Sequence, residues 1–393
     1  MKKIIITSMC LSLWGFSYTQ AQEKSVEEKK FTTVTEVKTT SVKNQQSTGT
    51  CWAFATMSYI ETELLRMGAP ELDLSEMYIV REAYSQKPKR YFRLHGKGNY
   101  SEGGQAHDVL NVVKTHGFVP ESIYQGNKYG SDFHIHREMV KSTKAMMDEI
   151  VKNPNKKITP VWFESVGGVL DTYLGKLTEK FTYDGKEYTP QSFSEEMGFN
   201  PDDYVELTSY NHHPYYGKMN LEIPDNWSDD LYYNLPIDEL MEVMNNALNN
   251  GFSVCWDGDV SEKGFSHRKG YAVLPAMKET DMSNSEIAKW EDGVENKTEK
   301  TPAKQLEPTV DQDLRQKTFN NFQTTDDHLM HLTGIVKDQN GIVYYKTKNS
   351  WADDSNKFGG YLNMSEAYVK LKTVAIMVHK DAIPKNIKKK LGL

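Results

Sequence analysis

One cysteine of this 393-residue chain lies in a context that could make its thiol a nucleophile. The stretch from Asn44 to Met57 reads NQQSTGTCWAFATM, and apolar residues recur at helical spacing from Cys51 until Gly68. We therefore expect Cys51 at the N-terminus of a helix, which favours the reactive thiolate. Gln45, six residues earlier, could add a side-chain N–H donor for an oxyanion beside the backbone N–H of Cys51.

Helical patterns come first along the chain and strand patterns last. One amphipathic stretch begins after Ser75 as N-cap, and another ends at Gly117. The second half contains the strand-like runs HLMHLTGIV and GIVYYKTKNSW, with an Asn-Gly turn signal between them. This order predicts an α+β protein with a helical half and a β-sheet half. A histidine base and a side chain that orients it would have to come from the sheet half.

Several motifs together resemble papain-like cysteine peptidases, and within them the bleomycin hydrolase and aminopeptidase C branch. The papain pattern of Gln, five residues, then Cys-Trp-Ala-Phe is met from Gln45 to Phe54, and KNSW and HLMHLTGIV resemble the family's later motifs. The segments LSEMYIV, GGQAHDVLNVVKTHGFVPES and WDGDV resemble that branch in particular. The resemblance implies a papain-like fold with a large insertion, peptide substrates, and no metal or organic cofactor.

The resemblance also assigns roles to individual residues. Cys51 would be the nucleophile and Gln45 the oxyanion donor. Asn349 would orient the histidine through its side-chain oxygen, and Trp351 would cover that hydrogen bond from water.

The histidine has two candidates, His328 and His331. Residues three apart on a strand face opposite sides, so one of the two can face Cys51. The family has a small residue six positions after its histidine, and Gly334 stands there for His328, whereas Lys337 stands there for His331. We therefore predict a Cys51–His328–Asn349 triad that rests as a thiolate–imidazolium pair.

Differences from papain favour the bleomycin hydrolase branch. The two positions that form a disulfide in papain-like sequences look like Thr48 and Ser101 here, so both thiols are missing together. His328 also follows Cys51 at about twice the papain-type spacing of about 130–150 residues. The predicted boundaries are a signal peptide at 1–21, an N-terminal segment at 22–40, the helical half at 41–139, an insertion at 140–235, the β-sheet half at 236–380 and a C-terminal tail at 381–393.

The C-terminal tail differs from that of the branch it resembles. There, an arm lies in the cleft and its terminal carboxylate meets the amino end of the substrate. This chain ends DAIPKNIKKKLGL, which is shorter and rich in lysine. We expect a solvated surface helix, and aminopeptidase selectivity that is weaker than in the branch.

The first 21 residues predict export. A basic start, a short apolar run and small residues ending at Ala21 are typical of a cleaved secretory signal, with a membrane anchor as the alternative. Cleavage would remove Lys2 and Lys3 and change the formal net charge from −7 to about −9. Such a charge argues against nucleic acid or an anionic membrane as partner. We expect a periplasmic or secreted protein.

The remaining cysteine and histidines have simpler interpretations. Cys255 lies in an apolar strand and is expected to be a buried thiol, although an exported protein could pair it with Cys51. His134 with His136, and His212 with His213, could each be half of a metal site. No third ligand is evident near either pair, so we expect surface histidines and no metal.

We conclude that the sequence predicts an exported cysteine peptidase, resembling the bleomycin-hydrolase-type aminopeptidases. A papain-like endopeptidase with an open cleft is the first alternative, and a non-catalytic binding protein on the same fold is the second. Peptides are the expected partners, and the resemblance adds a homo-oligomer as a candidate assembly.

Overall fold

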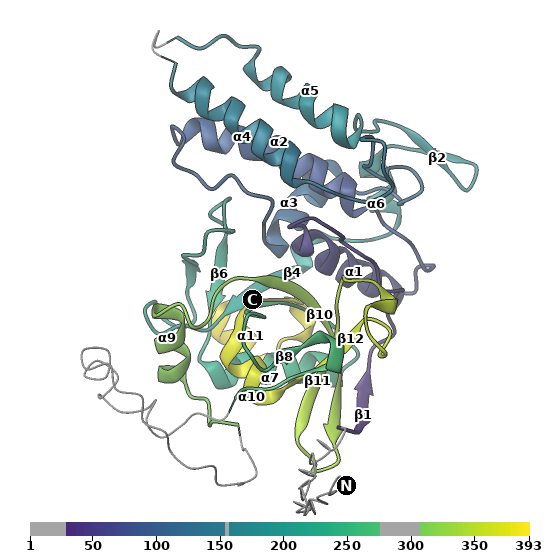
Figure 1. Cartoon of the computed structure of the whole chain (residues 1–393). Helices are drawn as coiled ribbons and strands as arrows, with labels where there is room; N and C mark the ends of the chain where they lie inside the picture. The colour runs from purple at the N-terminus through teal and green to yellow at the C-terminus, as the bar shows by residue number, and fades with distance from the viewer. Residues whose placement is uncertain (1–28, 154–156, 276–306) are drawn as a thin grey trace, which may run out of the picture.

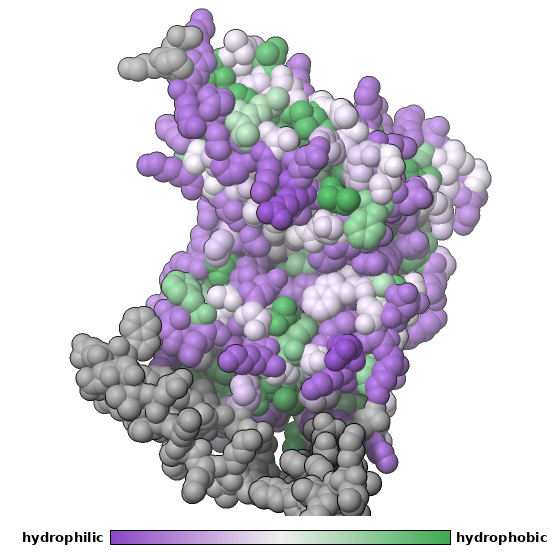
Figure 2. Space-filling model, in the orientation of Figure 1, coloured by the Kyte–Doolittle hydropathy of each residue, from purple (hydrophilic) through white to green (hydrophobic). Residues whose placement is uncertain are grey.

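The computed structural model describes residues 29–153, 157–275 and 307–393, so the predicted signal peptide lies outside the described residues. The N-terminal helices form one lobe and the strands of the C-terminal half form the other, with α1 (Cys51–Arg66) between them (Figure 1). Figure 2 shows hydrophilic side chains over most of this face, with hydrophobic ones scattered among them. No helix among the described residues is long and apolar enough to cross a membrane.

The helical lobe follows the boundary signals in the sequence. Its elements after α1 are α2 (Glu76–Arg93), α3 (Ala106–His116), α4 (Arg137–Val151), α5 (Trp162–Leu174), the hairpin β2 (Phe181–Tyr183) and β3 (Lys186–Tyr188), and α6 (Pro190–Glu196). The Ser75 side chain accepts a hydrogen bond from the backbone N–H of Tyr78 and caps α2. Gly117 ends α3 with a positive φ of 77°, a conformation that glycine adopts at little cost.

The other lobe is built on one large sheet. Its strands run in the order β5-β6-β4-β13-β7-β10-β11-β12-β9-β8, and β1 pairs with β10 beside this path. The bounds are β1 (Phe31–Glu36), β4 (Tyr204–Thr208), β5 (Lys218–Asn220), β6 (Leu231–Asn234), β7 (Val254–Gly258), β8 (Phe265–Ser266), β9 (Tyr271–Ala272), β10 (His328–Asp338), β11 (Val343–Lys348), β12 (Tyr361–Ser365) and β13 (Thr373–His379). The helices of this lobe are α7 (Ile237–Asn249), α9 (Gln312–Asn320), α10 (Glu366–Lys372) and α11 (Lys385–Leu391), with short 3₁₀ turns η1 (Pro201–Asp203), η2 (His267–Lys269), η4 (Asp353–Ser355) and η5 (Lys380–Ala382).

Helix α1 is buried along almost its whole length, because it packs against helices on one side and the sheet on the other. Its polar side chains are paired across that interface. Thr56 lies 3.5 Å from the sulfur of Cys255 on β7, and Ser58 lies 3.0 Å from Nδ1 of His331 on β10. These contacts fix the helix against the sheet and therefore fix where its first residue, Cys51, is placed.

Strand register defines two ends of the sheet. At one end, Gly258 of β7 pairs with His328 of β10 and with Thr373 of β13. At the other end of β13, His379 pairs with Tyr204. The predicted base therefore lies at the Gly258 end of the sheet.

Several parts of the chain are arranged differently from the predicted boundaries. The range 140–235, predicted as an insertion, is divided between the lobes, because α4 to α6 join the helices whereas β4 to β6 extend the sheet. The N-terminal segment supplies β1 to the same sheet. The tail helix α11 is not simply solvated as predicted, since Ile387 and Leu391 are buried in the core of the sheet lobe.

Gly334 shows why a small residue is needed six positions after His328. A Cβ built at Gly334 would lie 2.3 Å from the backbone oxygen of Thr35 on β1. We expect Gly334→Ala to push β1 away and to lower the free energy of unfolding by about 1–3 kcal/mol. The control is Gly168→Ala in α5, where a Cβ meets nothing within 4 Å and alanine should stabilise the helix. Urea unfolding of both variants checks this, and equal stabilities would contradict it.

Candidate active site

Cys51 is the first residue of α1 and is half-buried, with a free thiol. The first N–H groups of an α-helix have no carbonyl partner within the helix, so the backbone N–H of Cys51 can meet an incoming oxygen. The backbone of Leu329, the residue after His328, donates a hydrogen bond to the sulfur. Cys51, at the start of α1, thus lies against the start of β10 in the other lobe.

The loop before Cys51 is tethered to the segment around Glu102. The backbone N–H of Gly49 donates to Oε2 of Glu102 at 2.7 Å, and the indole N–H of Trp52 donates to the Glu102 backbone oxygen at 3.0 Å. Gly49 and Glu102 directly follow Thr48 and Ser101, the positions where the resemblance placed the missing disulfide. Hydrogen bonds therefore join the two segments at this place. No motif or spacing in the sequence indicated this role for Glu102.

The structure brings His328 and Asn349 together. Nε2 of His328 lies 2.8 Å from Oδ1 of Asn349. The same Oδ1 accepts the backbone N–H of Ser350 at 2.8 Å, which requires an oxygen at that position. The hydrogen of a neutral His328 ring is therefore on Nε2, and Nδ1 is left as a proton acceptor.

His267 is a member of this group that sequence reasoning missed. The Asn349 Nδ2 amide donates to Nδ1 of His267 at 3.3 Å, while Nε2 of His267 lies 2.7 Å from the Ser355 hydroxyl. The Trp351 ring packs beside both histidines, with ring centroids 4.9 Å from His328 and 5.0 Å from His267. Trp351 and His267 thus enclose the His328–Asn349 hydrogen bond.

Gln45 is held by Ser350. The Ser350 hydroxyl donates to Oε1 of Gln45 at 2.7 Å, and Nε2 of Gln45 donates to the backbone oxygen of Thr48 at 2.8 Å. An amide nitrogen carries two hydrogens, so the second remains available to a substrate oxygen.

His331 has a different environment from His328. It is completely buried against α1, with Nδ1 at 3.0 Å from the Ser58 hydroxyl, which in turn accepts a hydrogen bond from Lys348. Burial beside Lys348 lowers the pKa of His331 well below its ordinary value. Ser58 lies two helical turns after Cys51 on α1. His331 is therefore placed as a packing residue between the lobes, away from the Cys51 thiol.

Burial opposes charge on both members of the predicted ion pair. It raises the pKa of the Cys51 thiol to about 12, and the carboxylates of Asp326, Asp225 and Asp257 raise it as well. Burial also lowers the pKa of His328 to about 4. Burial therefore disfavours the charged form of each group, and the thiolate–imidazolium pair stays a prediction that a measurement on the protein has to test.

Cys255 is buried and free, as predicted, and burial raises its pKa above that of an ordinary thiol. The structure therefore excludes the Cys51–Cys255 disulfide that composition left open. His136 is also completely buried, at the N-cap of α4, so the prediction of a surface histidine is wrong there.

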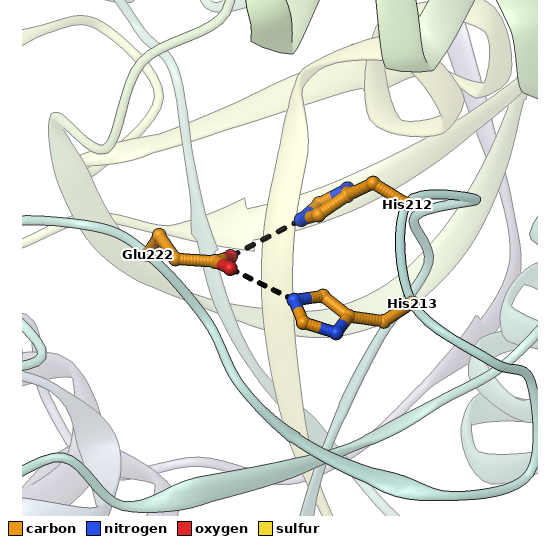
Figure 3. Close-up of side chains that lie close together, drawn as sticks. All are labelled: His212, His213 and Glu222. Carbon is orange, nitrogen blue, oxygen red and sulfur yellow. Dashed lines mark hydrogen bonds and ion pairs between the residues drawn. The ribbon is translucent and has the colours of Figure 1, made fainter.

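The other histidine pair does have a third group beside it. His212 and His213 both point at the carboxylate of Glu222, with Nε2 to oxygen distances of 3.1 and 2.8 Å (Figure 3). This is a donor set that zinc accepts, and it is the one such group of three in the described part of the chain. Sequence analysis missed Glu222 because it lies on a separate segment, after β5, and no local motif links it to the histidines. All three side chains are partly exposed and satisfy one another without an ion.

Comparison with known proteins decides the family. The sequence profile of the Peptidase C1-like family matches residues 2–392. The chain belongs to the Peptidase C1-like family. It is therefore a cysteine-type peptidase with a papain-like α+β fold, similar to aminopeptidase C and the bleomycin hydrolases.

Individual relatives are similar along most of their length. Aminopeptidase G of Lactobacillus delbrueckii subsp. lactis is 23% identical, over 90% of this chain and 84% of the relative. Aminopeptidase C of Listeria monocytogenes is 21% identical, over 90% and 83%. The crystal structure of PepW from Lactobacillus rhamnosis superimposes with a TM-score of 0.69 at 19% identity, covering 92% of this chain and 84% of that one.

The raised pKa of the Cys51 thiol predicts how its alkylation depends on pH. The rate with iodoacetamide should rise with a midpoint above the value of about 8.5 for a simple thiol. Asp326→Asn removes a negative charge that raises the pKa of Cys51, so its midpoint should fall. Asp381→Asn, at the far end of β13, is the control and should not move it. A rate that stays on a plateau below pH 6 would show that the ion pair forms despite burial.

Proposed function

We propose that this peptidase is exported and hydrolyses peptide bonds through Cys51, His328 and Asn349, acting on peptides with a free amino terminus. The observation that carries the triad is the 2.8 Å hydrogen bond from His328 to Asn349, beside the residue whose backbone contacts the Cys51 sulfur. The names of the aminopeptidase relatives support the substrate class, and the first 21 residues support export.

In the first step His328 acts as a general base. Its Nδ1 takes the proton of the Cys51 thiol as the sulfur attacks the substrate carbonyl, and the carbonyl π electrons move to the oxygen. The backbone N–H of Cys51 and the free N–H of Gln45 stabilise that oxyanion. The imidazolium keeps its Nε2–H on Asn349 throughout, so the ring does not rotate away from the sulfur.

Collapse of the tetrahedral intermediate then breaks the C–N bond. The departing amine takes the proton from Nδ1 of His328 and leaves a thioester on Cys51. Water attacks this thioester with His328 again as base, the C–S bond breaks, and the thiol is restored. Burial disfavours charge on both groups, so we expect proton transfer and attack to be coupled.

The two histidines of β10 separate this proposal from its alternatives. His328→Ala should lower kcat by about 10²–10⁴-fold because the general base is lost. His331→Ala is the matched variant on the same strand. Its kcat should fall less than tenfold after correction for the folded fraction, which circular dichroism measures. A fluorogenic dipeptide amide is the substrate, and Cys51→Ala sets the background. An inactive His331 variant with an active His328 variant would contradict the assignment.

Export is tested on the full-length protein made in a Gram-negative host. The mature form should begin at Gln22 and be found outside the cytoplasm, because the signal would be removed after Ala21. Intact mass and N-terminal sequencing of each cell fraction measure this. A protein that keeps Met1 and stays in the cytoplasm would refute export.

A further inference from the structure

Three carboxyl groups surround Cys51, and the catalytic steps use none of them. The charges of Asp326, Asp225 and Asp257 all act on the Cys51 thiol and raise its pKa. They come from separate segments of the chain: Asp257 lies in β7, Asp326 precedes the start of β10, and Asp225 lies between β5 and β6. The fold therefore places groups that disfavour the reactive thiolate next to the proposed nucleophile. These carboxyl groups must then have a role other than activating the thiol.

Strand geometry directs Asp257 toward the helical lobe. Cys255, two residues earlier on β7, contacts Thr56 of α1, and alternate residues of a strand share a face. Asp257 pairs in register with Leu329, whose backbone bonds the Cys51 sulfur. Its carboxyl group thus faces the region between the start of α1 and the start of β10.

Asp326 completes a carboxyl pair with Asp257. The two carboxyl groups lie close enough to interact, and the neighbouring Asp326 raises the pKa of Asp257 in addition to its burial. Asp326 also accepts the side-chain N–H of Gln105, the N-cap residue of α3, at 2.9 Å. Asp225 lies against the same segment, because a Cβ built at Gly103 would come within 1.8 Å of its Oδ2.

In the described part of the chain no Lys, Arg or His forms an ion pair with Asp257 or Asp326, whereas several other buried carboxylates are paired with a cation. Glu61 is paired with Lys43, Glu63 with Arg66, and Asp259 with Lys372. Asp257 is 3% exposed, and neither of its oxygens receives a hydrogen bond from a donor group in the described residues.

Asp326 and Asp225 are partly exposed, so a substrate group can reach the pair from solvent.

The tail around Leu393 lies away from this pair. Leu393 lines a cavity with Tyr204 and Lys380, at the end of β13 away from Thr373. Six residues of strand separate that end from the level of His328, which is about 20 Å.

We propose that the carboxyl pair Asp257–Asp326, with Asp225 beside it, binds the free α-ammonium group of the peptide substrate and so fixes its amino end near Cys51. This assignment rests on the proposed function and gives its selectivity a physical cause. A charge-assisted hydrogen bond to a buried carboxylate is strong enough to favour free over blocked amino termini by about tenfold or more. A lysine side chain of the substrate carries the same ammonium chemistry, and the experiment separates the two.

The test compares four fluorogenic dipeptide amides, with a free or acetylated amino end and with leucine or lysine as first residue. Wild-type protein should prefer the free forms. Asp326→Asn and Asp257→Asn should each raise KM for the free leucine peptide at least tenfold with little loss of kcat, and should not slow cleavage of the acetylated leucine peptide. The control is Asp327→Asn, an exposed neighbour that already accepts the Thr325 hydroxyl at 2.7 Å, and its KM should stay within twofold.

The pH dependence adds a signature that a structural role would not give. Burial raises the pKa of Asp326 to about 7, and burial together with the neighbouring Asp326 raises that of Asp257 well above its ordinary value, so the pair gains its first charge as pH rises through about 7. The substrate amino group loses its charge above about 7.7–8.0. Preference for the free peptide should therefore peak between about pH 7 and 8 and lose this peak in Asp326→Asn.

The outcomes are distinct. Folded Asn variants whose ratio of free to blocked cleavage equals that of wild type would overturn the ammonium site while leaving the peptidase assignment intact. A loss confined to the lysine peptides would overturn the α-ammonium assignment in favour of a side-chain site. Failure of the wild type to cleave any of the four peptides would instead count against the proposed function.

Discussion

The register between β10 and β11 is the constraint on which the site depends. His331 pairs with Lys348 across these strands, which brings the residues beyond them, His328 and Asn349, to the same end of the hairpin. A slip of one residue would turn Asn349 to the opposite face of the sheet and break its bond to His328. The turn at Asn340–Gly341, where Gly341 has a positive φ, and β1 packed against Gly334 both hold this register.

A second constraint is the interface between the lobes, because Cys51 and His328, the proposed nucleophile and base, come from different lobes. The interface is closed by hydrogen bonds within a mostly apolar core: Ser58 of α1 contacts both His331 and Lys348, and Thr56 contacts Cys255. Each partner is buried, so losing one would leave the other unsatisfied. His331 and Cys255 do not contact the Cys51 thiol. They fix α1 against the sheet and thereby fix the position of Cys51 relative to β10.

The sequence was most informative where local rules decide structure. Helix starts at Cys51 and after Ser75 follow from periodicity and capping, and the choice of His328 over His331 follows from the glycine six residues later, where β1 leaves no room for a side chain. It was least informative where segments far apart meet. His267 reaches Asn349 from η2, Glu222 reaches two histidines from another segment, and Asp257 meets Asp326 across β7 and β10. The burial and the carboxylates that raise the pKa of Cys51 were also missed, because no local pattern reveals them.

The acidic surroundings of Cys51 link binding to reactivity. The three carboxylates make the thiol a weaker acid, which on its own slows attack. An ammonium group bound between them would cancel part of their charge at the moment when the scissile carbonyl reaches the sulfur. For charges about 8 Å apart in a medium of effective dielectric constant about 20, the interaction is about 2 kcal/mol, or about 1.5 pKa units. A blocked peptide brings no such charge, so it would lose both the ammonium contact and this activation. Selectivity would then appear in kcat as well as in KM for the wild-type protein, since the substrate itself relieves the electrostatic cost that the fold places on its nucleophile.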